Sequence, residues 1–355
     1  MKKVLLAFAI LTSLIQTSCS SDNDSGNNNT TPEAITSITV TSNASTVDLG
    51  TSVILTAIGN NNASVSSNST FYVNGNAISG RSYTTSAVGT LDIYATYVNT
   101  NGVTLTSPTI QVVVNDVINF NKRVLIEDFT GTWCQFCPRV AYAIELVKAQ
   151  TSDVVVAAIH RGSTDPFNFS GASVLEDQIG LSGYPTAMLN RSTEWSYPET
   201  SATSVNQAVN LTSGTNPKLG VALETTTTGN TSTVNVKVKF GKNFNNNLKL
   251  VVYALEDNLI YNQTNSTSYY GGANPIVNFE HDHVLRAVLS SSILGENITG
   301  STSYNSEYSK SFTYTIPSNV NASNVRFVAF VIDSTNAALN SRDAGPNETQ
   351  SFEIE

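Results

Sequence analysis

The chain has 355 residues, of which 13% are charged, about half the share of a typical soluble protein. Its 18 Lys and Arg residues stand against 27 Asp and Glu residues, for a net charge of −9. Nucleic acid is therefore not expected as a partner, because a phosphate-binding surface needs clustered basic side chains. The length is enough for two or three domains. Only three cysteines are present, Cys19, Cys134 and Cys137.

The N-terminus has the pattern of a signal peptide. Lys2 and Lys3 precede an apolar run from Val4 to Ile15, which is shorter than the roughly 20 residues that cross a membrane as a helix. Cys19 follows this run after a short interval, and the whole segment resembles a lipoprotein signal. The residues after Cys19 are similar to the acidic export signal of Bacteroidetes-type lipoproteins. The resemblance implies that Cys19 bonds to membrane lipid and that the protein is an outer-membrane lipoprotein, at the cell surface or facing the periplasm. Ordinary secretion is the alternative.

The remaining sequence predicts a multidomain α+β protein. Short β-branched runs with turn signals, among them the hairpin sequence Asn74-Gly75, predict a small immunoglobulin-like β-sandwich. After Arg123, apolar strands at 124–126 and 154–159 flank a helical pattern at 139–150, which predicts a βαβ unit. Strands return at 219–224, 233–240, 248–255, 311–316, 325–332 and 352–354. The predicted parts are a signal peptide at 1–18, a flexible tether at 19–33, the immunoglobulin-like domain at 34–117, an α/β domain at 121–215 and a C-terminal β-sandwich at 216–355.

The sequence Cys-Gln-Phe-Cys at Cys134–Cys137 is the motif that carries chemistry. It follows a predicted strand and opens a predicted helix, where backbone N–H groups and the helix dipole stabilise a thiolate. Cys134 is the expected nucleophile, and Cys137, one turn further on, the thiol that resolves a mixed disulfide. Pro138 fits the first helical turn, where its missing donor costs nothing.

The passage from Asp128 through Trp133 to Cys134 is similar to the active-site passage of the thioredoxin-like superfamily. Gly183-Tyr184-Pro185-Thr186 looks like the same superfamily's cis-proline loop. The resemblance implies a thioredoxin-like α/β domain, a Cys134–Cys137 disulfide, Asp128 as proton relay with Glu127 as rival, and a cis Tyr184–Pro185 bond that presents a protein substrate. The Gln-Phe dipeptide departs from the thioredoxin pattern, so no reduction potential follows.

A second, narrower resemblance rests on residues 124–131, Cys134, Cys137-Pro138-Arg139, Pro185-Thr186 and Asn190-Arg191. These residues resemble the outer-membrane lipoprotein family named for a twenty-eight-kilodalton outer-membrane protein. The resemblance covers residues 123–355 and implies location and architecture more than activity.

The histidines are the other candidates for chemistry. His160, at a predicted strand end, lies either near the cysteines or at the surface, and the surface is favoured. In an extended segment, His281 and His283 point to one face, as a metal pair needs. A structural role or a solvated strand face is favoured over metal binding, and no cofactor is expected.

Two functions remain open. The favoured one is a tethered thiol–disulfide oxidoreductase, whose redox partner the sequence does not identify. The alternative is a non-catalytic surface binding or structural lipoprotein with a static disulfide. The motif supports the first, whereas the outward location supports the second, because no thiol donor is evident there to recycle a reductase.

Overall fold

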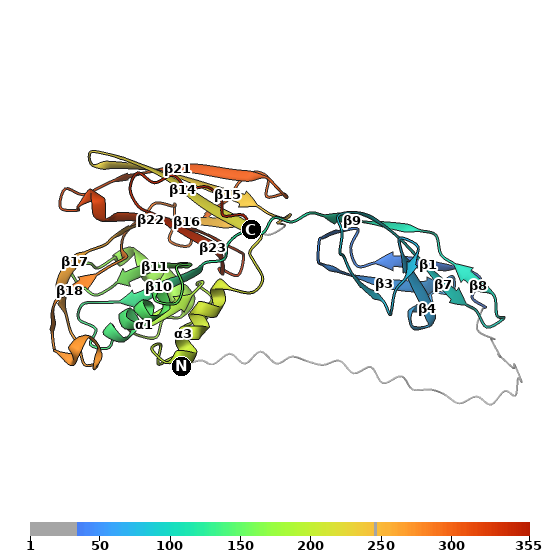
Figure 1. Ribbon diagram of the computed structural model, residues 1–355, viewed down its shortest axis with the longest axis horizontal. Helices are drawn as coiled ribbons and strands as arrows, with labels where there is room; N and C mark the ends of the chain where they lie inside the picture. Colours follow the sequence, from blue (N-terminus) through green and yellow to red (C-terminus); the bar gives the residue numbers. More distant parts are fainter. Residues whose placement is uncertain (1–33, 245–246) are drawn as a thin grey trace, which may run out of the picture. The chain divides into compact units, whose positions relative to one another are not determined.

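The computed structural model describes residues 34–244 and 247–355 (Figure 1). The predicted signal peptide, the lipidated Cys19 and the tether lie outside these residues. The described chain divides into two compact units. Of the described residues, one unit contains 34–41, 55–81 and 93–110, and the other contains 42–54, 82–92, 111–244 and 247–355.

Residues 34–115 are mainly β-strands, as predicted. Two sheets have the strand orders β1-β3-β6 and β2-β9-β7-β4-β5, with β8 paired to β7. The predicted hairpin turn is present, because Asn74 and Gly75 both have positive φ between β4 and β5. The strands are β1 (Ile38–Ser42), β2 (Thr46–Asp48), β3 (Ser52–Gly59), β4 (Ser69–Val73), β5 (Asn76–Ala77), β6 (Ser82–Thr84), β7 (Gly89–Val98), β8 (Thr104–Thr106) and β9 (Ile110–Asn115).

The rest of the chain is built around one nine-stranded mixed sheet. Its order is β13-β12-β10-β11-β19-β16-β22-β23, with β20 paired to β16 (Figure 1). Two smaller sheets accompany it, β14-β15-β21 and β17-β18. The strands are β10 (Val124–Thr130), β11 (Val154–His160), β12 (Thr186–Leu189), β13 (Thr193–Glu194), β14 (Leu219–Thr228), β15 (Thr231–Phe240), β16 (Lys249–Glu256), β17 (Leu259–Gln263), β18 (Ile276–His281), β19 (Val284–Val288), β20 (Glu296–Asn297), β21 (Glu307–Thr315), β22 (Val325–Ile332) and β23 (Ala338–Ala344).

Few helices accompany these strands. The α-helices are α1 (Pro138–Lys148), α2 (Ser173–Ile179) and α3 (Ala202–Val209), and the 3-10 helices are η1 (Ser66–Asn68), η2 (Ser170–Ala172), η3 (Asn210–Thr212), η4 (Tyr269–Gly272) and η5 (Ala322–Asn324). None of the described helices has the length and apolar character that a membrane crossing requires.

Side-chain alternation along the strands explains how the mixed sheet is covered. In β16, Leu250 and Val252 pack against the sheet β14-β15-β21, whereas Val251 and Tyr253 pack into a second core on the opposite face. β10 alternates in the same way, and its Ile126 packs with apolar residues of α1 and α3. Two-sided burial of this kind requires the near-continuous apolar runs that the sequence has here.

The prediction of a separate thioredoxin-like α/β domain flanked by a C-terminal β-sandwich is wrong. β10 and β11 are parallel, as a βαβ unit requires, but β11 also pairs with β19 at Ala158 and Val284. Strands from both predicted domains thus form a single sheet, and β-structure dominates the chain. The predicted strand at 352–354 is also absent, since Ile354 forms only an isolated bridge with Phe120.

Candidate functional site

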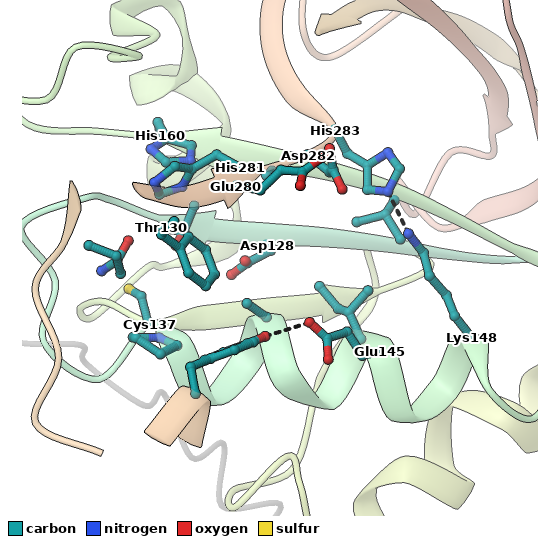
Figure 2. Close-up of a pocket in the computed structure, with 18 residues that line it drawn as sticks. Asp128, Thr130, Cys137, Glu145, Lys148, His160, Glu280, His281, Asp282 and His283 are labelled. Atoms are coloured by element: carbon teal, nitrogen blue, oxygen red, sulfur yellow. Dashed lines mark hydrogen bonds between the residues drawn. The ribbon is translucent and has the colours of Figure 1, made fainter. Parts of the chain in front are cut away.

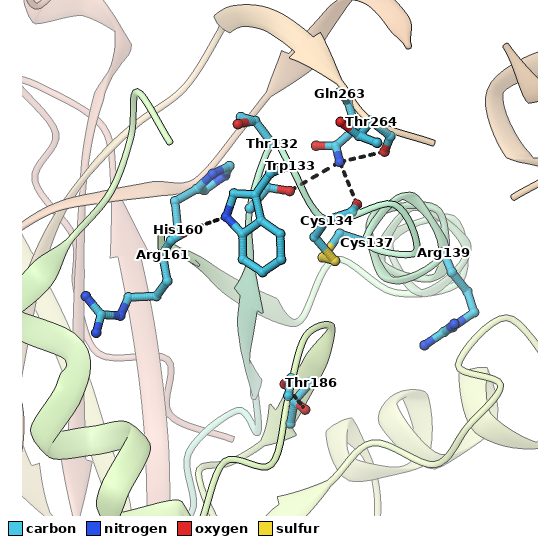
Figure 3. The surroundings of a disulfide bond; sticks show 12 residues. Thr132, Trp133, Cys134, Cys137, Arg139, His160, Arg161, Thr186, Gln263 and Thr264 are labelled. Carbon is cyan, nitrogen blue, oxygen red and sulfur yellow. Dashed lines mark hydrogen bonds between the residues drawn. A yellow bond between two sulfur atoms is a disulfide. The ribbon is translucent and has the colours of Figure 1, made fainter. Parts of the chain in front are cut away.

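The two cysteines lie where β10 turns into α1, and they form the predicted disulfide (Figure 3). Cys137 is the residue before the first helical residue, Pro138. Cys134 is 4% exposed and Cys137 is 2% exposed, so little of either residue reaches solvent. The loop turns tightly, because the Cys134 and Cys137 amides donate to the carbonyls of Gly131 and Cys134.

Trp133 lies beside the disulfide and is 43% exposed. Its indole Nε1 donates to the Arg161 carbonyl at 2.5 Å, and its ring meets the Tyr184 ring edge-on at 5.6 Å. Gly162 makes room for the indole, because a Cβ there would lie 2.4 Å from Trp133 Nε1. The position of Trp133 is thus fixed by backbone and ring contacts.

The proline loop has the expected backbone. The Tyr184–Pro185 peptide is cis, and Figure 3 draws the next residue, Thr186, among the surroundings of the disulfide. Tyr184 donates its hydroxyl hydrogen to Glu176 at 2.6 Å. Burial and this carboxylate raise the pKa of Tyr184 to about 12, so the phenol stays protonated at neutral pH.

A segment from the C-terminal half covers the cysteine loop. The side-chain amide of Gln263 donates to the carbonyls of Gly131 and Cys134, at 3.2 and 2.9 Å (Figure 3). The backbone N–H groups of Thr264 and Ser266 donate to the carbonyls of Thr132 and Gln135, both at 2.8 Å. We call residues 263–266 the covering segment. It supplies hydrogen-bond donors to the carbonyls of Thr132 and Gln135 and a second hydrogen bond to those of Gly131 and Cys134.

A cavity of about 110 Å³ lies between β10, α1 and the β17–β18 hairpin (Figure 2). We call it the Asp128 cavity. It brings together residues from distant parts of the sequence, including Asp128, Cys137, Glu145, Lys148, His160, Gln263, Tyr270, Phe279, Glu280, His281, Asp282 and His283.

Asp128 is the buried acid of this cavity. It is 4% exposed, and its Oδ1 has no hydrogen-bond partner among the described residues. Burial, with a smaller contribution from the nearby carboxylate of Glu199, raises the pKa of Asp128 to about 8, although Arg139 acts to lower it. At neutral pH the carboxyl group is mostly protonated.

Glu127, the rival acid, points to the other face of β10. It forms a buried ion pair with Arg191, whose Nη2 lies 2.7 Å from Glu127 Oε1, and it accepts a hydrogen bond from Tyr253 at 3.0 Å. Glu127 therefore does not line the Asp128 cavity, and its contacts are structural.

The three histidines differ in their surroundings. The expectation that His160 lies at the surface is wrong, because it is 2% exposed and its Nδ1 lies 3.2 Å from Asp165 Oδ2. His281 is also buried, with its ring 5.2 Å from that of His160. His283 has a φ of 58°, which breaks the extended geometry expected for residues 281–283, and it contacts Asp257 and Lys148. His281 and His283 thus do not converge as a metal pair (Figure 2).

Two residues of the site were not predicted from the sequence. Gln263 contacts the cysteine loop directly. Tyr270 lines the cavity and donates to Glu145 at 2.7 Å. Neither lies near the cysteines in sequence, so no local signal pointed to them.

A comparison with protein-family models identifies one family. The family described as "Outer membrane protein Omp28" matches residues 172–350. HBP35 of Porphyromonas gingivalis is similar in structure, with 19% identity, a TM-score of 0.53, and coverage of 65% of this chain and 77% of that chain. A domain of the outer membrane lipoprotein Omp28 from Porphyromonas gingivalis is 23% identical, with a TM-score of 0.26 and coverage of 38% and 92%. A search among curated proteins found no match.

Proposed function

Because this chain belongs to the Omp28 outer membrane protein family and is an outer-membrane protein, we propose that it is a non-catalytic lipoprotein that binds or supports other components there. The Cys134–Cys137 disulfide is static in this proposal and stabilises the binding surface. Cys19 carries the lipid anchor, so Cys19→Ser is expected to release the protein from the membrane fraction.

The observation that carries the proposal is the covering segment. A disulfide that exchanges with protein substrates needs access to a sulfur and a loop that can adjust. Here both cysteines are buried, and the carbonyls of Gly131, Thr132, Cys134 and Gln135 all accept hydrogen bonds from residues 263–266. Loop and covering segment therefore hold each other in one conformation.

Exposed aromatic side chains support a binding role. Trp133 is 43% exposed, Phe136 is 45% exposed and Tyr197 is 75% exposed. Arg139, in the first turn of α1, places its guanidinium 4.6 Å from the centre of the Tyr197 ring. Aromatic and Arg side chains are enriched in protein interfaces, and rigid ones lose little entropy on binding.

Trapping with Cys137→Ser tests the proposal. In this variant Cys134 cannot form its disulfide with Cys137. If the protein is an oxidoreductase, Cys134 accumulates mixed disulfides with substrates. If the disulfide is static in the parent protein, the remaining Cys134 thiol is buried and largely unreactive. We expect no reproducible mixed disulfide when the variant is produced in its native host. The control is Cys134→Ser, which leaves only Cys137.

A thiol–disulfide oxidoreductase is the competing function, and one observation favours it. The carboxyl group of Asp128 lines the same cavity as Cys137, where a proton relay would stand. Specific partners trapped through Cys134, but absent with Cys134→Ser, would establish this function and reject the static disulfide. A reduction potential below about −300 mV, as for structural disulfides, would support the static one.

A further inference from the structure

Two buried side chains in the wall of the Asp128 cavity have polar atoms without partners. They are Asp128, through Oδ1, and His281, through Nε2. His281 is 5% exposed. A buried polar atom left unpaired costs about 1–3 kcal/mol, so natural proteins rarely keep one without a reason. In residues 34–244 and 247–355, Ser341 has the one other such atom, and it does not line this cavity.

His281 presents a hydrogen-bond acceptor to the cavity. Burial, with a further contribution from His160, lowers the pKa of His281 to about 4, so the ring is neutral at physiological pH. The ring also forms a hydrogen bond with the backbone of Tyr261. A neutral imidazole that donates one N–H to a carbonyl has a lone pair on its other nitrogen, which here is the unpaired Nε2.

The charges around the cavity favour a cation over an anion. Glu145 lines it, and the exposed Glu280 and Asp282 add carboxylates at its solvent side. Lys148 is the one Lys or Arg in the lining, against the four acidic side chains of Asp128, Glu145, Glu280 and Asp282. An anion would therefore meet more carboxyl groups than basic groups.

Aromatic rings complete the lining. Tyr270 and Phe279 meet edge-on with ring centres 5.0 Å apart, and both line the cavity. Aromatic rings bind organic cations through their negative faces. At about 110 Å³ the cavity is smaller than the roughly 300–1,000 Å³ of pockets for drug-sized ligands, so the occupant is small.

We propose that the Asp128 cavity binds a small organic cation, an alkylammonium or guanidinium group. Its N–H groups donate to Asp128 Oδ1 and His281 Nε2, and its carbon or planar part contacts Tyr270 and Phe279. The group belongs either to a free amine or to the end of a Lys or Arg side chain of a partner.

Binding is expected to depend on pH through Asp128. The titratable and charged groups that line the cavity with it are Glu145 and Lys148 on α1, His160 on β11, Tyr270 in η4, and Glu280, His281, Asp282 and His283 on and after β18. The Arg139–Glu199 pair also acts on its carboxyl, whereas Cys137 is in the disulfide and does not titrate. The cation favours the carboxylate, and the pKa of Asp128 is about 8. Affinity therefore rises up to about tenfold per unit from pH 6 to 8 and levels off above that range. His281 stays neutral throughout.

Titration of the full-length protein at pH 8 with matched probes tests the site. Guanidinium is compared with urea, which has the same shape without the charge, and n-butylammonium with butyrate, each at a concentration far below the denaturing range. Calorimetry is expected to show saturable binding of both cations and none of urea or butyrate. N-acetyl-lysine methylamide distinguishes a free amine from the side chain of a protein partner. It binds only if an amine carried on a peptide can enter the cavity.

Three variants locate the site. Asp128→Asn keeps the shape but removes the charge, and His281→Phe removes the acceptor; each is expected to weaken binding about tenfold or more. Glu194→Gln, an exposed carboxylate in β13, is the control and is expected to bind normally. Circular dichroism checks that each variant folds. The proposal would be overturned if urea and guanidinium bound equally, or if neither cation showed saturable binding. It would also be overturned if folded Asp128→Asn bound the cations as the parent protein does.

Discussion

Two neighbouring acids in β10 have opposite roles because side chains alternate across a strand. Glu127 is paired with Arg191 in the core, whereas Asp128 faces the cavity with one oxygen unpaired. The chemical identity of the two residues is nearly the same. Burial raises the pKa of Asp128 to about 8, so this carboxyl gains or loses its charge near neutral pH.

Asp128→Asn is expected to stabilise the protein at pH 8. The folded-state pKa of about 8 lies above the ordinary value of 3.8, so the folded state binds more protons and the free energy of unfolding falls as pH rises from about 4 to 8. The slope is up to about 1.4 kcal/mol per pH unit. Urea unfolding of the variant should lose this slope and match the parent protein near pH 4. An unchanged slope in Asp128→Asn would contradict the prediction. The control is Glu194→Gln, which is expected to keep the slope of the parent protein.

Replacing both Cys134 and Cys137 by Ser is expected to lower the free energy of unfolding by about 2 kcal/mol. The disulfide closes a short loop, with a sequence separation of 3, and short loops contribute little chain entropy. Chemical denaturation measures the loss. The parent protein in reducing buffer is the matched control, and a loss far above this value would mean that the disulfide also organises the covering segment.

At the scale of elements, the covering segment and the cysteine loop depend on each other. Gln263 closes β17, far from the loop in sequence, yet its amide reaches two loop carbonyls. A local motif is thus completed by a distant strand end. The loop is held without any metal or further disulfide among the described residues.

Gln263→Ala is expected to destabilise the protein by about 1–3 kcal/mol, because the Gly131 and Cys134 carbonyls each lose one of their two hydrogen bonds, at about 0.5–1.5 kcal/mol per bond. Reduction of the disulfide by dithiothreitol should become faster, because the loop opens more readily. Asn262→Ala is a matched control, since Asn262 is exposed and accepts one bond from the Asn278 amide. Equal reduction rates in the two variants would show that the covering segment does not restrain the loop.

Local patterns in the sequence predicted many elements but not their partners. The apolar runs of β10 and β11, the helix after Cys137 and the Asn74-Gly75 turn all depend on short-range signals, and all are present. The covering segment depends on a Gln side chain and backbone groups, which have no periodic pattern. The Asp128 cavity likewise forms only when β18 lies near α1. The residues that line it could therefore not be predicted from their spacing in the sequence.

At the scale of the whole molecule, the mixed sheet joins segments that resembled separate domains. β11 and β19 pair in parallel, and the Ala158 amide donates to the His283 carbonyl at 2.8 Å. The sequence resembles a familiar α/β domain up to β12, but the resemblance did not reveal that its sheet continues through β19 to β23. Strand pairing between distant segments leaves no local mark in the sequence.

The fragment 116–215 is expected not to fold by itself, whereas 116–355 is expected to fold. The shorter fragment would expose the apolar residues of β10 and β11 that pack against β16 and β22 in one core. The two fragments are compared by thermal melts followed by circular dichroism. The dispersion of their amide resonances in NMR spectra is a second measurement. A cooperative melt of 116–215 would show that this segment is an independent domain after all.

The long-range pairing also has a kinetic meaning. Until residue 284 has been synthesised and exported, β11 has an unpaired edge at Ala158, and an exposed apolar edge can pair with other chains. Contacts between distant residues also form slowly, because the intervening chain must first close a large loop. The nascent protein therefore passes through an aggregation-prone interval that ends only when its last third arrives, so its yield in the envelope should depend on periplasmic chaperones.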